Sequence, residues 1–206
     1  MKSETMEKDL MKQLFLTALI ATLLAGPATA KEPDAQALEA RAEGARAVIK
    51  RLALELQTEL KAAKAERGPG GAVKVCQKIA PQIAADLTEE TGWQVRRTAL
   101  KVRNPENRPR PQELRVLRDY AARAARGEAL AGMETLRVDV LGGERGLHFM
   151  KAIPVQEACL ACHGNALAPG VAEALGQAYP EDQAVGFAAG DLRGAFSLFK
   201  PLATTE

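Results

Sequence analysis

Residues that bind metal ions through nitrogen or sulfur are scarce in this chain of 206 residues, which has three cysteines and two histidines. A structural zinc site uses about four such ligands, usually in two closely spaced pairs. Beyond the cluster at residues 159–163, the chain offers only the isolated Cys76 and His148. The sequence therefore does not favour a zinc site.

A strong excess of charge of one sign is also missing. Lys and Arg number 28 and Asp and Glu number 26, so the formal net charge is +2. Nucleic-acid-binding domains usually carry a marked basic excess. The composition gives no indication of a nucleic-acid partner.

The apolar run from Leu14 to Ala25 is too short for an ordinary membrane span, because about a dozen residues fall well below the roughly 20 that cross a bilayer. A basic start at Met11-Lys12 precedes the run and small residues up to Ala30 follow it, which is the layout of a secretory signal peptide. We expect cleavage after Ala30, and a retained anchor is the weaker alternative. Residues 1–10 carry three acidic side chains, so Met11 is an alternative start.

The most informative motif is Cys159-Leu160-Ala161-Cys162-His163. Two thiols separated by two residues, with a histidine directly after the second, are the requirement for covalent attachment of a c-type haem. The competing interpretation as a redox-active dithiol prefers a βαβ context and needs no histidine. The motif predicts one covalent haem c with His163 as an axial ligand. Because haem c is attached outside the bacterial cytoplasm, the leader and the motif together predict a periplasmic protein.

Removal of the leader leaves about 176 residues, enough for one compact domain. The segment Asp34–Arg67 has the apolar spacing of a long amphipathic helix, which ends at the Gly68-Pro69-Gly70-Gly71 sequence. We expect this helix to pack on the domain or on a twin helix in a homodimer; a role as a signalling helix is the alternative. A second helix is predicted from Ala72 to Thr88, with Cys76 facing inward and Pro81 bending its middle.

The rest of the chain predicts an α+β fold with an antiparallel sheet. Helices are expected over Gln112–Arg126, over a short segment bearing the haem motif and over Pro169–Ala178. A rigid turn is expected over residues 104–109. Strands are expected over Trp93–Arg103, over a hairpin of Glu134–Leu141 and Gly146–Ile153, and over a closing pair of Ala184–Ala189 and Ala195–Leu202.

Candidates for the second axial ligand are Cys76, His148, Met133 and Met150. Cys76 could equally be a small buried apolar residue. Alternation places His148 on one strand face with Met150, where a hydrogen-bonding or pocket-lining role is favoured over ligation. Met150 is expected in the core, and Met133 is expected in a loop.

Two arginines are candidate partners for the haem propionates, because the guanidinium group suits carboxylates. Arg97 and Arg103 share one face of the predicted strand by period-two spacing. The competing interpretation is a solvated, charged strand face.

Several segments in order resemble the PAS-like, single-haem c-type sensor domains. The resemblance rests on Ala72-Val73-Lys74-Val75-Cys76 with Pro81, on Arg97-Thr98, on Arg103-Asn104-Pro105 with Asn107, on Cys159–Gly164, and on Gly186-Phe187, Gly190-Asp191 and Arg193-Gly194. Ala99, Arg108 and Arg110 depart from the pattern and affect loop contacts. The resemblance implies a PAS-like fold over residues 68–206, preceded by the leader (1–30) and the N-terminal helix (31–67). It also implies His/Cys ligation of the haem, with Cys76 opposite His163.

Two functions follow from these expectations. The first is a redox-responsive or gas-responsive haem sensor, which would bind a diatomic gas or change redox state and signal through a separate partner protein. The second is a small electron-transfer cytochrome whose thiolate ligand gives it a low potential. An enzymatic role such as a peroxidase is least favoured, because His148 would be its sole acid or base imidazole.

Overall fold

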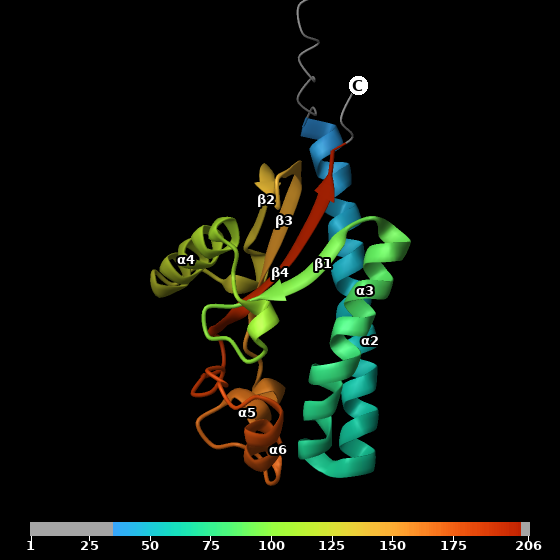
Figure 1. Ribbon diagram of the computed structural model, residues 1–206. Coiled ribbons are helices and arrows are strands. Elements are labelled where there is room, and N and C mark those ends of the chain that lie inside the picture. The colour runs from blue at the N-terminus through green and yellow to red at the C-terminus, as the bar shows by residue number, and fades with distance from the viewer. Residues whose placement is uncertain (1–34, 203–206) are drawn as a thin grey trace, which may run out of the picture. The chain divides into compact units, whose positions relative to one another are not determined.

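A computed structural model describes residues 35–202, so the predicted leader lies outside the described residues. Within them, a four-stranded antiparallel sheet in the order β1-β4-β3-β2 has helices on both faces (Figure 1). Its strands are β1 (Gln94–Thr98), β2 (Glu134–Leu141), β3 (Glu144–Pro154) and β4 (Leu192–Pro201). The α+β class, the antiparallel sheet and the long N-terminal helix are confirmed. No helix in the described range is long and apolar enough to cross a membrane.

The N-terminal part of the domain is a helical hairpin (Figure 1). Helix α2 (Ala35–Lys74) contains one non-helical residue, Gly68, with φ 69° and ψ −176°, at which the chain reverses. The predicted end of the first helix is therefore correct. The second helix begins earlier than predicted, directly after Gly68, because Pro69 has the backbone geometry of a first helical turn.

The returning arm of the hairpin contains one turn of π-helix, η1 (Val75–Ile79), followed by α3 (Ala80–Thr91). The amide of Ala80 donates to the carbonyl oxygen of Val75, five residues back, rather than to that of Cys76. Pro81 then lies in the first turn of α3, where the missing N–H is tolerated. The irregularity in this helix is thus a π-helical turn directly before the proline.

The sheet separates two hydrophobic clusters. On one face, the apolar stripe of α2, including Ile49, Leu52 and Leu56, packs with α3 against Leu147 and Leu198. On the other face, Leu117 and Tyr120 of α4 (Pro111–Ala125) belong to a cluster with sheet residues of β3 and β4. Of the two expected roles of the N-terminal helix, packing on its own domain is the one observed.

The remaining elements connect the sheet edges: η2 (Pro105–Asn107), η3 (Leu130–Gly132), α5 (Glu157–His163) and α6 (Val171–Ala178). The predicted hairpin and the helices at α4, α5 and α6 are confirmed to within a few residues. Two strand predictions are wrong. The first strand ends at Thr98 rather than Arg103, and residues 184–189 form no strand.

The start of β4 lies against the end of β1 with no room for a side chain. Gly194 has φ +156°, and a Cβ atom at this position would collide with the carbonyl oxygen of Thr98. Glycine is therefore required for this close approach. The approach brings Arg193 and Arg97 to the same end of the sheet, beside α5.

Candidate functional site

A cavity of about 440 Å³ lies between the helical hairpin and the α5–α6 region. This volume falls within the range of roughly 300–1,000 Å³ that is typical of small-molecule and cofactor sites. Apolar residues of three segments form much of its wall, among them Leu60, Val73 and Leu175. The cavity is thus built by parts of the chain that lie far apart in sequence.

Both thiols of the pentapeptide and its histidine line this cavity. Cys159 and Cys162 are three residues apart on α5, so their side chains lie on the same side of the helix. Both thiols are free and half-buried. Burial raises the pKa of the Cys162 thiol, while the cations Lys64 and Arg103 act in the opposite direction.

The ring of His163 is held by one hydrogen bond. Its Nδ1 lies 2.7 Å from the carbonyl oxygen of Ala184, and because a carbonyl only accepts, Nδ1 carries the hydrogen. The Phe187 ring packs edge-on against the imidazole, with a centroid distance of 6.2 Å. Burial, with the charges of Arg193 and Arg103, lowers the pKa of His163 to about 3. The imidazole is therefore neutral at pH 7, with Nε2 available as a ligand atom.

Residues 184–189 contribute to the site rather than to the sheet. The carbonyl of Ala184 accepts from His163, and the amide of Phe187 donates to the carbonyl of His163. The amide of Gly186 donates to Gly164, and φ at Gly186 is +75°, which is incompatible with a regular strand. The alternating apolar pattern that predicted a strand here reflects packing beneath α5 instead.

Arg103 also supports this segment. Its guanidinium donates to the Asp182 carboxylate at 3.0 Å and to the carbonyl oxygens of Cys162 and Ala184 at 2.7 and 3.1 Å. Arg103 touches the cavity, but these bonds occupy its side chain, which is 7% exposed. The prediction that Arg103 shares a strand face with Arg97 is wrong, because Arg103 lies after the end of β1 and joins three segments.

Cys76 lines the cavity from the hairpin side, within the π-helical turn. Its thiol is free and half-buried. Single turns of π-helix occur often at functional sites, since the extra residue per turn changes the direction of the side chains. The structure therefore brings Cys76 to the cavity that also contains the three pentapeptide side chains.

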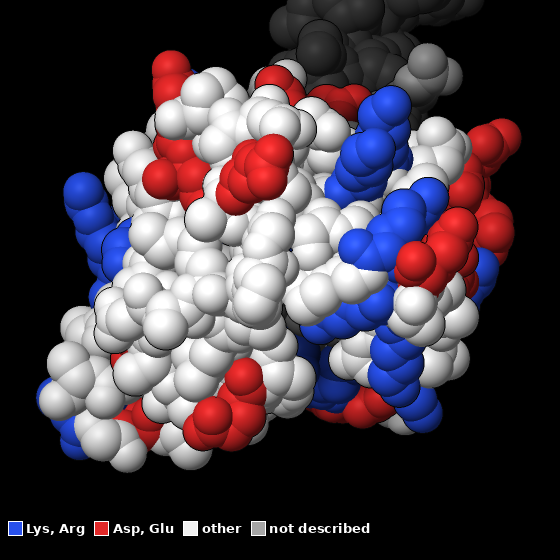
Figure 2. Space-filling model, turned by 90° about the horizontal axis from the view of Figure 1, so that it is seen from below, with Lys and Arg blue, Asp and Glu red and all other residues white. Residues whose placement is uncertain are grey.

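The charged side chains that line the cavity are all cationic. Lys61, Lys64, Arg97, Arg103 and Arg193 contribute to the wall, whereas no Asp or Glu within residues 35–202 does so. Seen from below, Lys and Arg side chains gather along one side of a hollow at this end of the molecule (Figure 2). The cavity is suited to a ligand with an apolar body and anionic groups.

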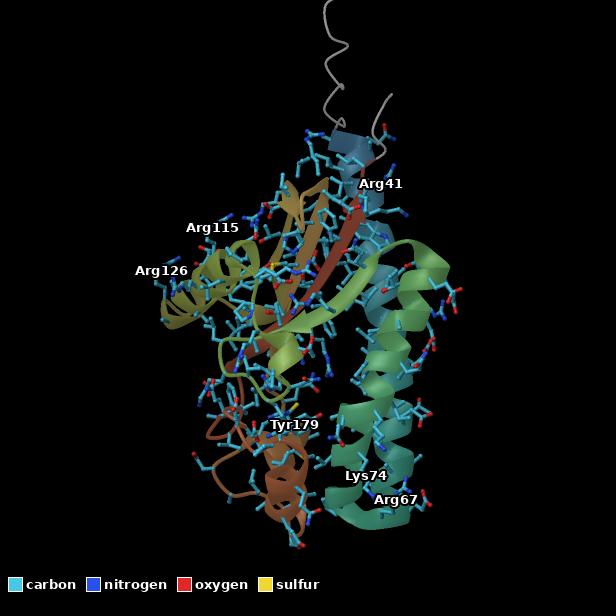
Figure 3. The ribbon with its side chains drawn as sticks, viewed as in Figure 1. Arg41, Arg67, Lys74, Arg115, Arg126 and Tyr179 are labelled. Atoms are coloured by element: carbon cyan, nitrogen blue, oxygen red, sulfur yellow. The ribbon has the colours of Figure 1, made fainter. Side chains whose placement is uncertain are left out.

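Sequence reasoning did not identify Lys61, Lys64 or Tyr179 as site residues. Tyr179 follows α6 at the level of the cavity, while Arg67 and Lys74 lie at the turn of the hairpin (Figure 3). Burial raises the pKa of Tyr179 to about 12. The sequence did contain one indication that Lys64 is a site residue. Lys64 follows Leu60 by one helical turn, so a charged side chain interrupts an apolar helix face.

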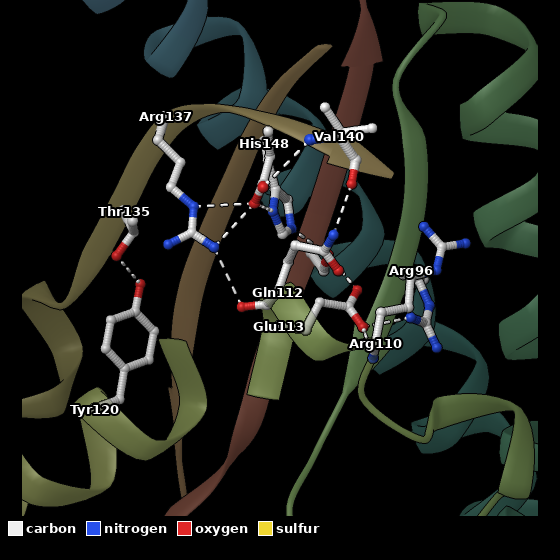
Figure 4. A network of polar contacts seen from close by, with 11 residues as sticks. Arg96, Arg110, Gln112, Glu113, Tyr120, Thr135, Arg137, Val140 and His148 are labelled. Carbon is white, nitrogen blue, oxygen red and sulfur yellow. Dashed lines mark hydrogen bonds and ion pairs between the residues drawn. The ribbon is translucent and has the colours of Figure 1, made fainter. Parts of the chain in front are cut away.

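His148 does not line the cavity, which corrects the prediction that it is a pocket residue. It is 1% exposed on the α4 face of the sheet and contacts Asp139 and Ser197 (Figure 4). Met133 and Met150, the other ligand candidates, are each 1% exposed in the cluster against α4. Of the four candidates for a second axial ligand, the structure brings Cys76 alone to the cavity wall.

Within the described residues, no group of three or more His, Cys, Asp and Glu side chains is placed to hold a metal ion. The donors at the cavity are instead one imidazole and three thiols, which line an apolar space.

Comparison with known proteins gives two matches. The crystal structure of the cyanobacterial heme-protein Tll0287 is similar in fold, with a TM-score of 0.58 and 24% sequence identity. The similarity covers 84% of this chain and 100% of that one. A search of curated proteins finds no match. The sequence profile of the Tll0287-like family matches residues 28–201, which include every segment that forms the cavity. The chain belongs to the Tll0287-like family.

Proposed function

We propose that this protein binds one haem c in the cavity and acts as a redox-responsive or gas-responsive sensor. The observation that carries the proposal is the meeting of Cys159, Cys162, His163 and Cys76 on the wall of one cavity. The similarity to a heme-protein of the same fold supports haem as the ligand.

The residues present fit a haem in both size and chemistry. The cavity combines apolar walls with imidazole and thiol donors, which are the side chains that ligate haem iron. When bound, the haem supplies an iron centre that exchanges single electrons and can take a diatomic gas as a ligand.

Each residue then has a defined part. Cys159 and Cys162 attach the cofactor: each sulfur forms a C–S bond to one carbon of a vinyl group, and the thiol hydrogen is transferred to the other vinyl carbon. His163 presents Nε2 to the iron, while the hydrogen bond from Nδ1 to Ala184 fixes the orientation of the ring. Cys76 would hold the iron as a thiolate, because coordination to a cation favours the deprotonated sulfur.

The cationic wall holds the propionates. Lys61, Lys64 and Arg97 are the residues that we assign to this role, whereas Arg103 is committed to Asp182 and to two carbonyl groups. The Arg193 Cζ atom lies 5.5 Å from the centroid of the Phe187 ring, and the guanidinium donates to the carbonyl oxygen of Lys101. Arg193 therefore mainly supports the His163 side of the cavity.

The sensing step is retention or release of Cys76. Single π-helical turns are rare and lie frequently at functional sites, which supports a functional role for the segment that bears this ligand. Release of Cys76 would let the haem supply gas binding, whereas retention would limit the haem to a change of oxidation state. The second candidate function, a low-potential electron carrier, is favoured by the rigid hydrogen bonding around His163 and Arg103, which suits a centre that does not rearrange.

The predicted leader supports export to the periplasm, where haem c is attached and where a separate signalling or redox protein would receive the signal. Homodimerisation through the N-terminal helix would use the face of α2 that is not packed on the sheet. We do not assign an enzymatic activity.

Electron paramagnetic resonance of the ferric protein tests the ligand assignment. Thiolate ligation gives a narrow spread of g values, and Cys76→Ala is expected to abolish it and to allow binding of carbon monoxide. Met150→Leu is the matched control, since it removes another candidate sulfur with little change in volume and is expected to leave the spectrum unchanged. An unchanged spectrum in Cys76→Ala would overturn the assignment.

Covalent attachment is tested separately by mass spectrometry under denaturing conditions. The protein is expected to retain a mass increase of one haem, and the variant with both Cys159→Ala and Cys162→Ala is expected to lose it. Reversible loss of cofactor from the unmodified protein would contradict haem c.

A further inference from the structure

A chain of buried polar groups crosses the sheet face that packs against α4 (Figure 4). The Glu113 carboxylate, the Ser197 hydroxyl, the His148 ring and the Asp139 carboxylate follow one another in this chain. The Oε1–Oγ distance is 2.7 Å, the Oγ–Nε2 distance is 2.9 Å, and the Nδ1–Oδ2 distance is 3.1 Å. Glu113, His148 and Ser197 are at most 2% exposed. The two contacts of Ser197 are therefore closed to water, and the contact between His148 and Asp139 is partly buried.

The number of hydrogens available does not match these contacts. Three hydrogen bonds need three hydrogens. Two ionised carboxylates supply none, a serine hydroxyl supplies one, and a neutral imidazole supplies one. One contact would then set two lone pairs against each other in a buried place, which is unfavourable. One additional proton completes the chain.

The imidazole is the group that takes this proton, because other donors satisfy both carboxylates. Glu113 Oε2 accepts from the Arg96 guanidinium at 2.6 Å and from the backbone amide of Arg110 at 2.7 Å. Asp139 Oδ2 accepts from two nitrogens of Arg137, at 3.0 and 2.9 Å. At Asp139, burial raises the pKa, but the hydrogen bonds from His148 and Arg137 outweigh it and hold the pKa below its ordinary value.

Two influences on the ring oppose each other. Burial is the largest electrostatic cause and, together with the positive charge of Arg137, it outweighs the hydrogen bond to Asp139 and the negative charges of Glu113 and Asp139, so it lowers the pKa of His148 below its ordinary value. The hydrogen count acts in the other direction, since only the imidazolium donates through both nitrogens, to Ser197 and to Asp139.

The arrangement Ser197–His148–Asp139 has the connectivity of a hydrolytic triad, but Ser197 is not placed as a nucleophile. Its hydroxyl donates to Glu113, and the residue is 2% exposed within β4. A nucleophilic serine instead presents its oxygen to the substrate while its hydrogen faces the histidine.

We propose that Glu113, Ser197, His148 and Asp139 form a buried binding site for one proton, which is held on the His148 ring between the two carboxylates. The ligand is a proton from solvent, and its binding changes the charge of the site by one. The site is separate from the haem cavity, and the proposal does not depend on haem binding.

The proton site connects to the cavity through Arg96. Besides its bond to Glu113, Arg96 donates to the carbonyl oxygens of Glu106 and Arg108, at 2.7 and 3.1 Å. These carbonyls lie in the loop whose residues Asn104 and Asn107 line the cavity. Loss of the proton alters the hydrogen bonding of Glu113 and thereby acts on a loop of the functional site.

Nitrogen NMR of the purified protein, labelled with ¹⁵N only in histidine, tests the proposal directly. The chain has two histidines, so the spectrum shows at most two imidazoles. The His148 ring is expected to have two protonated nitrogens at pH 7.5. A neutral ring at pH 7.5 would overturn the proposal, and this measurement needs no variant.

One variant supplies the missing hydrogen. In Glu113→Gln the amide can donate to Ser197, so the ring is expected to become neutral with its hydrogen on Nδ1. A ring that stays charged in the folded Glu113→Gln variant would refute the hydrogen-bond chain.

Discussion

Arg103 provides a sharp test of what holds the His163 side of the cavity together. Arg103→Met keeps an unbranched side chain of similar length and removes the guanidinium. The variant leaves the Asp182 carboxylate, whose side chain is 10% exposed, without its cation, and it also removes donors to two carbonyl groups. Loss of one partner of a buried ion pair costs about 3–5 kcal/mol. We expect the free energy of unfolding to fall by this amount.

A neighbouring ion pair is the control. The Nη2 atom of Arg108 lies 3.4 Å from Oε2 of Glu181, but the two side chains are 67% and 75% exposed. Exposed pairs contribute about 0–1 kcal/mol, so Arg108→Met is expected to change stability by no more than this. The two variants replace the same residue type in the same part of the fold, so they differ chiefly in burial.

Urea unfolding at pH 7 measures both effects. With a dependence on urea of about 2 kcal/mol per molar, Arg103→Met is expected to lower the midpoint by about 1.5–2.5 M. The double variant with Asp182→Leu leaves no buried charge unpaired and is expected to recover part of the loss. Equal midpoints for Arg103→Met and Arg108→Met, or strictly additive losses in the double variant, would refute the proposed role of the buried pair.

Three further perturbations test the packing and electrostatics of the fold. Tyr120→Phe removes a buried hydroxyl that hydrogen-bonds to β2 and β3, at 3.0 Å in each case, and should cost about 1–2 kcal/mol in thermal unfolding. Desolvation raises the pKa of Glu134, but hydrogen bonds from Lys151 and Arg46 outweigh it and hold that pKa below its ordinary value. The resulting stability is present above about pH 5 and is lost as pH falls through the native pKa, so Glu134→Gln should differ from wild type at pH 7 and converge with it in acid; a constant difference would contradict the ion pairs. Gly194→Ala should cost about 2 kcal/mol or more, because the added Cβ meets the backbone of β1, and a variant as stable as wild type would contradict this close approach.

The parts of the fold that sequence reasoning predicted well are those set by local patterns. The hairpin of β2 and β3 has alternating apolar residues around two glycines, and α4 has a helical apolar stripe. These elements agree with the structure because neighbours in sequence determine them. The haem attachment that the pentapeptide predicts stays a prediction.

The errors arise where contacts between distant segments decide the conformation. Residues 184–189 alternate like a strand, yet their backbone groups bond to α5 and to Arg103. Period-two alternation placed His148 on the same face as Met150, which is correct. It could not tell which face α4 would cover, so both a hydrogen-bonding and a pocket-lining role were expected for His148, and the structure shows the hydrogen-bonding role. The π-helical turn at Cys76 leaves no periodic signal, because a single extra residue shifts the helix only locally.

The cavity also implies an order of assembly. The attachment motif occupies five adjacent residues, whereas the walls come from segments between Leu56 and Gly194. In the proposed haem protein, the thioether bonds can form on a chain that has not yet folded, since they require nothing beyond the pentapeptide. Ligation by Cys76 must wait until the hairpin and α5 meet, because closing so long a loop carries an entropic cost that only the assembled core offsets. The optical spectrum of the axial ligand would therefore act as an intrinsic reporter of the last stage of folding.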